Sequence, residues 1–391
     1  MNQNPFLIRQ VTTGPKYHWF GYYDKMQFDP SGQFLLGMEV TFEHRRPSPE
    51  DTIVIGMVDL LDNNEWIELG TSRAWCWQSG CMLQWIPNNP GKIIWNDRKK
   101  DRFISHILNI HTREHIELDF PVFTLHPDGI TALGLDFERL EYMRPGYGYC
   151  GIQDRNQNKP APDSAGIYTL NLQKGTKDIL LSLAQVSQIR DFKREFKDSK
   201  HYFNCLLFNP AGTDFVFLHR WRDDFGKGWP FRTRMFSAKA DGSQLEVLVP
   251  GGCGHFNWKD NHHLIVQEDG FWIYQIGQGR KEQLGKSILP GSGGHVSFFP
   301  GSDWLVGDTY PDQKRDQILY LYNFRNSRFL EAGRFHSPLA YTGARDNHVD
   351  DEWRCDLHPR ISTESRKICF DSVHTPQGRQ MYLMDVSTLI V

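Results

Sequence analysis

Short hydrophobic segments separated by proline- and glycine-containing turns recur along the whole chain. The sequences QFDPSG at residue 27, QWIPNNPG at 84, TLHPDG at 124 and LFNPAG at 207 each lie between two such segments. Looser versions occur as NWKDNH at 257, SFFPGSD at 297 and RISTESR at 360. A strand, a tight turn and a second strand predict a β-hairpin. The pattern therefore predicts seven hairpins, and further apolar segments such as GIYTLNL and ILYLYNF add strands to them.

Seven repeated units of about four strands each predict an all-β fold, a seven-bladed β-propeller. The last unit, residues 355–391, offers only three strands, so the N-terminal segment FLIRQVT is expected to add the fourth and close the ring. We expect residues 1–391 to form a single domain. Two packed β-sandwiches are the alternative, but the regular recurrence of one hairpin type favours the propeller.

One segment departs from the strand pattern. In KDILLSLAQVSQIRDFKREF, residues 177–196, apolar side chains recur at positions 179, 183, 186, 189 and 192. This spacing is typical of a helix. The sequence therefore predicts a short helical insertion at the surface between blades 3 and 4.

Composition and charge narrow the class of protein. The 391 residues are 39% hydrophobic and carry a formal net charge of −3, which predicts neither a nucleic-acid nor a membrane partner. No apolar run approaches the roughly 18 residues of a transmembrane helix. The N-terminus MNQNPFLIRQ lacks the features of a secretory signal, which predicts a cytoplasmic protein, or a periplasmic or secreted one if a signal peptide has been removed. Seven scattered cysteines without a CxxC pair are expected to be free thiols.

Polar side chains gather where the inner strands of a propeller should begin and end. In RCDLHPRIS, residues 354–362, Asp356, His358 and Arg360 alternate and would share one face of a strand. His255 and His295 both follow glycine-rich approaches, so we expect equivalent positions for them. The other inner positions are Gln78, Asn96, Asp97, Asp136, Arg139, His201, Asn204, His219, Arg220, Arg222, Asn257, Asp308, Tyr310 and Asp371.

Two kinds of chemistry suit this set. His295, Asp356 and His358, on adjacent blades, could bind a divalent cation, because imidazole and carboxylate are common metal ligands. Arg220 and its neighbours could instead bind a substrate carboxylate through the planar guanidinium. A solvated channel without chemistry is the third interpretation, since water can satisfy polar groups there.

Motifs in the last four blades resemble those of oligogalacturonate lyases, which are seven-bladed propellers. These motifs are HRW, GGHVSFF with VGDTYP, and HPRIS with KICFDS, within residues 200–375. The resemblance implies that Arg220 and His255 are the catalytic pair, and that His295 and His358 are two metal ligands. Asp356 stands where this family has a further histidine, and Trp353 falls near the family's glutamine ligand. This departure leaves the identity of the metal open, with Mn and Ca both considered.

The N-terminal half is similar to a second group. YHWFGYYDKMQFDPSG and WCWQSGCMLQWIP resemble propellers that include ulvan lyases and enzymes acting on rhamnosyl-glucuronate. No catalytic residue is carried over from that group. Its aromatic run at 19–23 is read either as blade packing or as a sugar contact, and the tyrosines of RPGYGY at 144 are equally ambiguous.

Both resemblances imply a partner that is a uronate-containing oligosaccharide or polysaccharide, cleaved by β-elimination. A base removes the C5 proton, and a cation stabilises the enolate-like intermediate. We expect His255 or His201 to be the base and Arg220 to neutralise the carboxylate. Further substrate contacts are expected from Asn204, His219, Arg222, Tyr310 and Arg360. A glycoside hydrolase acting on rhamnose–glucuronate linkages, or a non-catalytic binding module, are the alternatives.

Overall fold

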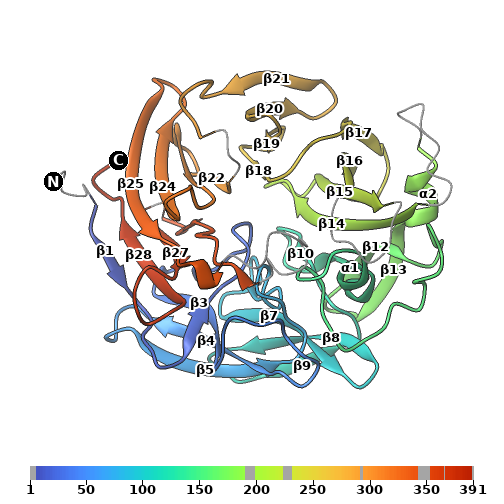
Figure 1. Cartoon of the computed structure of the whole chain (residues 1–391). Helices are drawn as coiled ribbons and strands as arrows, with labels where there is room; N and C mark the ends of the chain where they lie inside the picture. Colours follow the sequence, from blue (N-terminus) through green and yellow to red (C-terminus); the bar gives the residue numbers. More distant parts are fainter. Residues whose placement is uncertain are drawn as a thin grey trace.

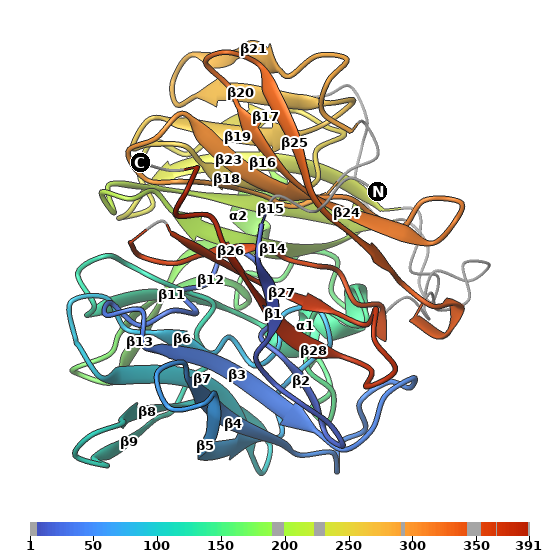
Figure 2. The ribbon, with the colours of Figure 1, turned by 90° about the vertical axis from the view of Figure 1, so that its left-hand side faces the viewer.

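The structure is a computed structural model that describes residues 6–189, 199–222, 231–290, 294–341, 353–364 and 366–389. Within these residues the chain forms seven four-stranded antiparallel sheets. Figure 1 shows the sheets arranged around a central axis in the order of the chain, and Figure 2 shows the same ring from its side. The predicted all-β, seven-bladed β-propeller is confirmed.

The first four blades follow the order of the chain. Their strands are β2 (Tyr17–Trp19), β3 (Phe34–Val40), β4 (Ile53–Asp59) and β5 (Glu65–Ser72) in blade 1; β6 (Gln84–Trp85), β7 (Lys92–Lys99), β8 (Arg102–Asn109) and β9 (His115–Leu118) in blade 2; β10 (Thr124–Leu125), β11 (Thr131–Leu135), β12 (Gly166–Asn171) and β13 (Thr176–Ser182) in blade 3; and β14 (Lys200–Phe208), β15 (Asp214–Arg222), β16 (Arg232–Lys239) and β17 (Glu246–Val249) in blade 4.

The last three blades complete the ring. Their strands are β18 (Phe256–Trp258), β19 (His263–Gln267), β20 (Phe271–Gln275) and β21 (Gly279–Leu284) in blade 5; β22 (Val296–Phe298), β23 (Trp304–Asp308), β24 (Asp316–Asn323) and β25 (Arg328–His336) in blade 6; and β26 (Arg360–Ile361), β27 (Lys367–Ser372), β28 (Gln380–Asp385) and β1 (Ile8–Gln10) in blade 7. A 3-10 turn at Leu339–Tyr341 follows blade 6.

The N-terminal strand closes the ring, as predicted. β1 pairs antiparallel with β28, with Ile8 opposite Met384 and Gln10 opposite Tyr382. Figure 1 shows β1 beside β28 in this blade. Blade 7 therefore combines strands from both ends of the chain, which closes the ring.

The turns between the first two strands of each blade follow from their sequence. In blade 1, Asp29 Oδ1 accepts a hydrogen bond from the backbone N of Phe34 at 2.7 Å, and Gly32 takes a φ of +72°. In blade 4, Asn209 fills the place of Asp29, and Gly212 has a φ of +73°. A left-handed residue is needed at this point, and glycine adopts that conformation without a Cβ clash.

Two α-helices interrupt the strands in or beside blade 3. α2 (Leu183–Ser187) lies between β13 and β14, and its N-cap Ser182 accepts a hydrogen bond from Gln185 N at 3.1 Å. The predicted insertion between blades 3 and 4 is thus confirmed, but the helix is shorter than the apolar spacing indicated. Ile179 belongs to β13, because the segment pairs with β12 before the helix begins. Phe192 lies outside the described residues.

α1 (Phe137–Met143) joins β11 to β12 and was not predicted. Phe137, Leu140 and Met143 are buried on its inner face. None of the helices in the described part of the chain is long and apolar enough to cross a lipid bilayer.

Candidate active site

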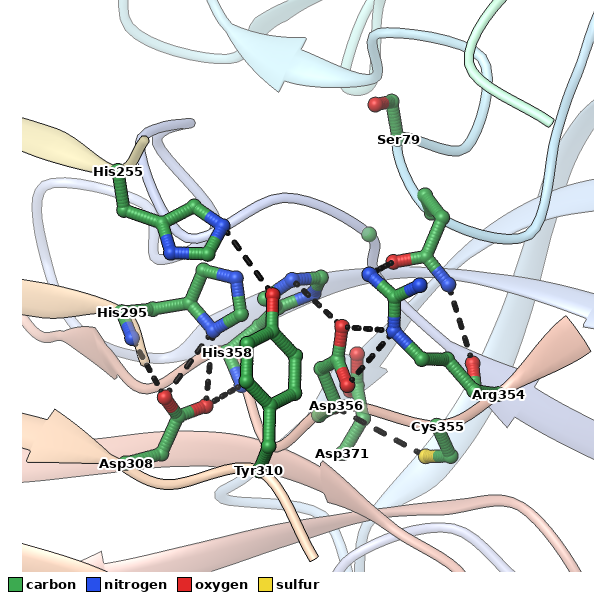
Figure 3. A network of polar contacts seen from close by, with 12 residues as sticks. Ser79, His255, His295, Asp308, Tyr310, Arg354, Cys355, Asp356, His358 and Asp371 are labelled. Carbon is green, nitrogen blue, oxygen red and sulfur yellow. Dashed lines mark hydrogen bonds and ion pairs between the residues drawn. The ribbon is translucent and has the colours of Figure 1, made fainter. Parts of the chain in front are cut away.

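Three histidines from consecutive blades meet at the centre of the ring. His255 directly precedes β18, His295 directly precedes β22, and His358 lies two residues before β26. The ring centroids of His255 and His295 are 4.2 Å apart, as are those of His295 and His358. Figure 3 shows the three imidazoles side by side. Because the three residues precede the innermost strands of neighbouring blades, the ring closure brings them together.

Asp308, at the end of β23, fixes two of these histidines. Its Oδ1 lies 3.0 Å from His295 Nδ1 and accepts a hydrogen bond from the backbone N of His295 at 2.6 Å. Its Oδ2 accepts a hydrogen bond from the backbone N of His358 at 2.9 Å. A carboxylate at Nδ1 favours the tautomer that carries its proton there, which leaves the lone pair of His295 on Nε2.

The opposite nitrogens of these two rings are buried and lack hydrogen bonds. Among the described residues, neither His295 Nε2 nor His358 Nε2 has a hydrogen-bond partner. Buried polar atoms are normally satisfied, so an unsatisfied pair of this kind indicates a place for a ligand. The pair lies next to Asp356: one ligand atom from each of His295, Asp356 and His358 falls within 4.8 Å of the others.

The backbone is strained where this set is built. His358 has a φ of +44°, which side chains other than glycine rarely adopt. Pro359 follows it directly. The hydrogen bond from His358 N to Asp308 helps to hold this conformation, which aims the imidazole at His295. Such strain is found preferentially at functional sites.

These features fit a divalent metal ion. Two imidazole nitrogens and one carboxylate oxygen are suitable ligands, and a hydrogen bond from the other ring nitrogen to a carboxylate is the usual second contact of a ligating histidine. His295 has that contact with Asp308. The set has two nitrogen ligands, whereas calcium prefers oxygen ligands alone.

Arg354 lies on the other side of Asp356. Its Nε donates hydrogen bonds to both carboxylate oxygens, at 2.9 Å and 3.1 Å. Its Nη2 donates to Gln78 Oε1 at 3.3 Å and to Tyr147 Oη at 3.2 Å. Figure 3 shows Asp356 between this guanidinium and the histidines. Arg354 therefore connects blade 7 with residues that precede blade 2 and residues that follow α1.

His255 lies beside His295 but has a hydrogen-bond partner of its own, Tyr310. Its Nε2 lies 3.3 Å from the hydroxyl of Tyr310. Burial, followed by electrostatic interactions with His295, Arg354 and Arg220, holds the pKa of His255 well below its usual value. A neutral imidazole can accept a proton, so His255 has the state that a general base requires.

Arg220, on β15, supplies a permanent positive charge near His255. Its Nε donates a hydrogen bond to Thr233 Oγ1 at 3.0 Å, and its guanidinium lies 4.6 Å from the centre of the Phe231 ring. These contacts hold the planar group in a fixed orientation. The structure thus brings six of the predicted residues to the centre: Arg220, His255, His295, Tyr310, Asp356 and His358.

His201 and His219 are not part of this group. The register of β14 against β15 places Tyr202 opposite Arg220 and Phe203 opposite His219. Side chains alternate between the faces of a sheet, so His201 and His219 point away from the face that carries Arg220. His201 Nδ1 lies 2.8 Å from His219 Nε2, and Arg234 Nε donates to His219 Nδ1 at 3.0 Å. The structure thus places His201 and His219 in a buried hydrogen-bonded network on the face opposite Arg220; the roles expected for them, as base and as substrate contact, stay predictions.

Three other side chains that were predicted to contact substrate form hydrogen bonds within the protein. Arg360 forms a paired contact with Asp371, at 2.8 Å and 3.2 Å, and donates to Gln27 at 2.7 Å, which uses its guanidinium within the blade. Arg222 donates to the backbone oxygen of Met143 at 3.0 Å. Asn204 Oδ1 accepts from the backbone N of Cys205 at 2.8 Å, at the bulge of β14. The contacts of Arg360 account for its burial without a ligand. Asn204 Nδ2, by contrast, is buried without a hydrogen-bond partner among the described residues, and substrate contacts by Asn204 and Arg222 stay predictions.

Tyrosines complete the site and were not identified as such from the sequence. The Tyr22 ring lies 5.0 Å from the His358 ring, and the Tyr23 ring lies 4.9 Å from the His295 ring. Trp19 and Phe20 of the same run are buried in the core. The first residues of the run at 19–23 therefore pack the blade, and its last two reach the centre; a sugar contact by this run stays a prediction. Tyr147, from the RPGYGY segment, reaches the same place through Arg354.

Comparisons with known proteins support the fold. No protein-family model matches the sequence, and no curated protein matches it. Among solved structures, an oligogalacturonate lyase in complex with manganese is similar with a TM-score of 0.67 and 14% identity, covering 98% of this chain and 94% of that one. Oligogalacturonate lyase from Vibrio parahaemolyticus is similar with a TM-score of 0.64 and 13% identity, covering 98% and 95%.

A more distant propeller is also similar. The β-propeller domain of the trilobed protease from Pyrococcus furiosus has a TM-score of 0.51 and 10% identity, covering 94% of this chain and 96% of that one. Identities this low show the fold alone, and one fold carries many functions. The expected resemblance to oligogalacturonate lyases is thus confirmed at the level of the fold: the chain has the seven-bladed propeller architecture of those enzymes.

Proposed function

We propose that this protein is a lyase that cleaves uronate-containing oligosaccharides or polysaccharides by β-elimination. The observation that carries the proposal is the buried His255, which contacts His295 and Tyr310 and whose pKa is lowered by burial and by charges that include Arg220, beside a set of side chains that could bind a metal ion. A base next to a fixed positive charge is what the removal of a proton α to a carboxylate requires. Oligogalacturonate, which the two similar lyases are named for, is the first glycan to test.

The proposed reaction moves one proton from carbon to oxygen. His255 takes the C5 proton, the C5–H electrons form the C4=C5 double bond, and the C4–O bond breaks. The guanidinium of Arg220 stabilises the negative charge that develops on the substrate carboxylate. The leaving oxygen takes the hydroxyl proton of Tyr310, and protonated His255 returns a proton to Tyr310 across their 3.3 Å contact.

A divalent cation would be held by His295, Asp356 and His358. When bound, it would act as a Lewis acid toward the uronate carboxylate and add to the charge stabilisation by Arg220. Of the two cations considered from the sequence, manganese is proposed over calcium, because two of the three ligands are imidazoles.

The proposal is tested by the ultraviolet absorbance of the unsaturated uronate that only elimination produces. Purified protein is incubated with oligogalacturonate and other uronate glycans, with and without EDTA. The wild type should produce the absorbance, and His255→Gln should lower kcat by at least about a hundredfold. His201→Gln is the matched control; if it folds, it should retain activity, because His201 faces away from Arg220.

The remaining outcomes separate the alternatives. Release of a free sugar without the absorbance would show hydrolysis and reject elimination. Binding without turnover on every glycan would show a binding module. Equal loss of activity in the two histidine variants, with both folded, would contradict the assignment of His255 as the base.

A further inference from the structure

Asp356 lies between the guanidinium of Arg354 and two imidazoles, those of His295 and His358, whose Nε2 atoms have no hydrogen-bond partner among the described residues. Arg354 Nε donates to both of its oxygens, and the two side chains are only 17% and 2% exposed. On the other side, Asp356 Oδ2 lies 3.8 Å from His358 Nε2. The same carboxylate is therefore the partner of Arg354 in this structure and a member of the candidate metal set.

Both roles cannot be filled equally well at the same time. Metal bonds to nitrogen and oxygen are about 2.1 Å long, so two ligand atoms of one ion are at most about 4.2 Å apart. The three candidate atoms spread over as much as 4.8 Å, so they must contract to bind an ion. Meanwhile the guanidinium, which is permanently charged, would lie within a few ångström of the dication in a buried site, where repulsion is weakly screened.

Arg354 has other hydrogen-bond acceptors if its bond to Asp356 weakens. Its Nη2 already donates to Gln78 Oε1 and Tyr147 Oη. Its backbone oxygen is held by Gln78 Nε2 at 3.2 Å and by Arg379 Nη2 at 3.3 Å. The residue is thus anchored independently of Asp356, so releasing the carboxylate would not leave the guanidinium without partners.

We propose that Arg354 and a divalent cation compete for Asp356. The protein then binds the cation more weakly than its three ligands alone would allow, and keeps a positive charge beside Asp356 when the metal is absent. This inference rests on the metal site of the proposed function. It assigns to Arg354 the role of a positioning residue that sets metal affinity.

The test measures Mn²⁺ binding directly, by titration calorimetry at about pH 8, where free imidazoles are neutral. Arg354→Gln removes the competing charge and should bind Mn²⁺ at least tenfold more tightly than the wild type. Arg354→Lys keeps the charge and should stay within a few-fold of the wild type. Asp356→Asn should bind Mn²⁺ more weakly than either. Arg354→Met, which retains the aliphatic stem, replaces Arg354→Gln should the latter not fold.

A matched control is another arginine–aspartate pair outside the site. Arg45 binds Asp51 with two hydrogen bonds, at 2.6 Å and 2.7 Å, on the surface. Arg45→Gln should leave the Mn²⁺ affinity unchanged. Equal or weaker Mn²⁺ binding by Arg354→Gln would overturn the inference, as would the absence of Mn²⁺ binding in every variant. This test measures metal binding and not turnover. The elimination reaction is tested separately, by the formation of the unsaturated product.

Discussion

The hydroxyl of Tyr23 forms two hydrogen bonds with the backbone of Phe256. It donates to the Phe256 oxygen at 2.7 Å and accepts from the Phe256 nitrogen at 3.1 Å, although 233 positions separate the two residues. Phe256 begins β18 on the inner edge of blade 5, where no further strand pairs with it. Tyr23 thus satisfies a buried strand edge and fixes the residue that follows His255.

Tyr23→Phe should therefore affect both stability and catalysis. Two buried backbone groups would lose their partner, and each such loss typically costs about 1–3 kcal/mol. We expect a lower midpoint in thermal unfolding, and a lower kcat because His255 is held less firmly. Tyr320→Phe is the control, since the Tyr320 hydroxyl is buried without a hydrogen-bond partner among the described residues. A larger loss of stability in the control than in Tyr23→Phe would contradict this account.

Substitution of Arg220 should reduce elimination without unfolding the protein. Loss of a group that stabilises developing charge typically lowers kcat by roughly 10²–10³-fold. We expect this loss for Arg220→Gln, and a smaller one for Arg220→Lys, which keeps the charge but not the planar pair of donors. The rates are measured from the unsaturated product. Arg334→Gln removes an exposed arginine paired with Glu331 and should retain wild-type rates; an unchanged rate in Arg220→Gln would exclude the proposed role.

Arg360 is expected to matter for stability rather than for substrate binding. Removing one partner of a buried ion pair typically costs about 3–5 kcal/mol, because the other charge is left unpaired. Arg360→Met would leave Asp371 in this state, and the urea midpoint should fall accordingly. At a temperature where the variant is folded, its KM should stay close to that of the wild type. A large rise in KM with unchanged stability would instead restore Arg360 as a substrate contact.

The contribution of Glu138, on α1, to the stability of the protein should fall as the pH rises from about 4 to about 7. Burial, together with the nearby Asp136, raises the pKa of Glu138 to about 7. The pKa of an unfolded glutamate is about 4.3, so between these values the folded state binds more protons than the unfolded state. Stability contributed by the neutral carboxyl is therefore lost as the group ionises in the folded protein.

Glu138→Gln removes this ionisation. We expect a higher unfolding midpoint than the wild type at about pH 8. No gain is expected at about pH 4, where Glu138 is largely protonated in both the folded and the unfolded state. Glu117→Gln is the control of opposite sign, because a hydrogen bond from Lys99 lowers the pKa of Glu117. That variant should be slightly less stable than the wild type at the higher pH. A gain for Glu138→Gln that does not depend on pH would show another cause.

Local patterns in the sequence were sufficient to predict the blades. Each blade begins with a hairpin whose turn chemistry, as at Gly32 and Gly212, is set by adjacent residues. The closing strand β1 was predictable because the last unit had too few strands. His255, His295 and His358 could also be found from the sequence, because each precedes a predicted inner strand.

The tertiary structure decided which polar residues share the site. His201 lies on β14 and Arg220 on β15, and their side chains point to opposite faces of blade 4. The face that each side chain takes depends on strand register, including the bulge in β14 where Cys205 has a φ of +54°.

Tyr22, Tyr147 and Arg354 carry no local signal for their role. They come from segments far apart in the sequence that the ring closure brings together, as the contacts of Tyr22 with His358 and of Tyr147 with Arg354 show. Alternation and turns are properties of neighbouring residues and can be read from the sequence. Convergence at the axis depends on the packing of all seven blades, which only the folded structure contains.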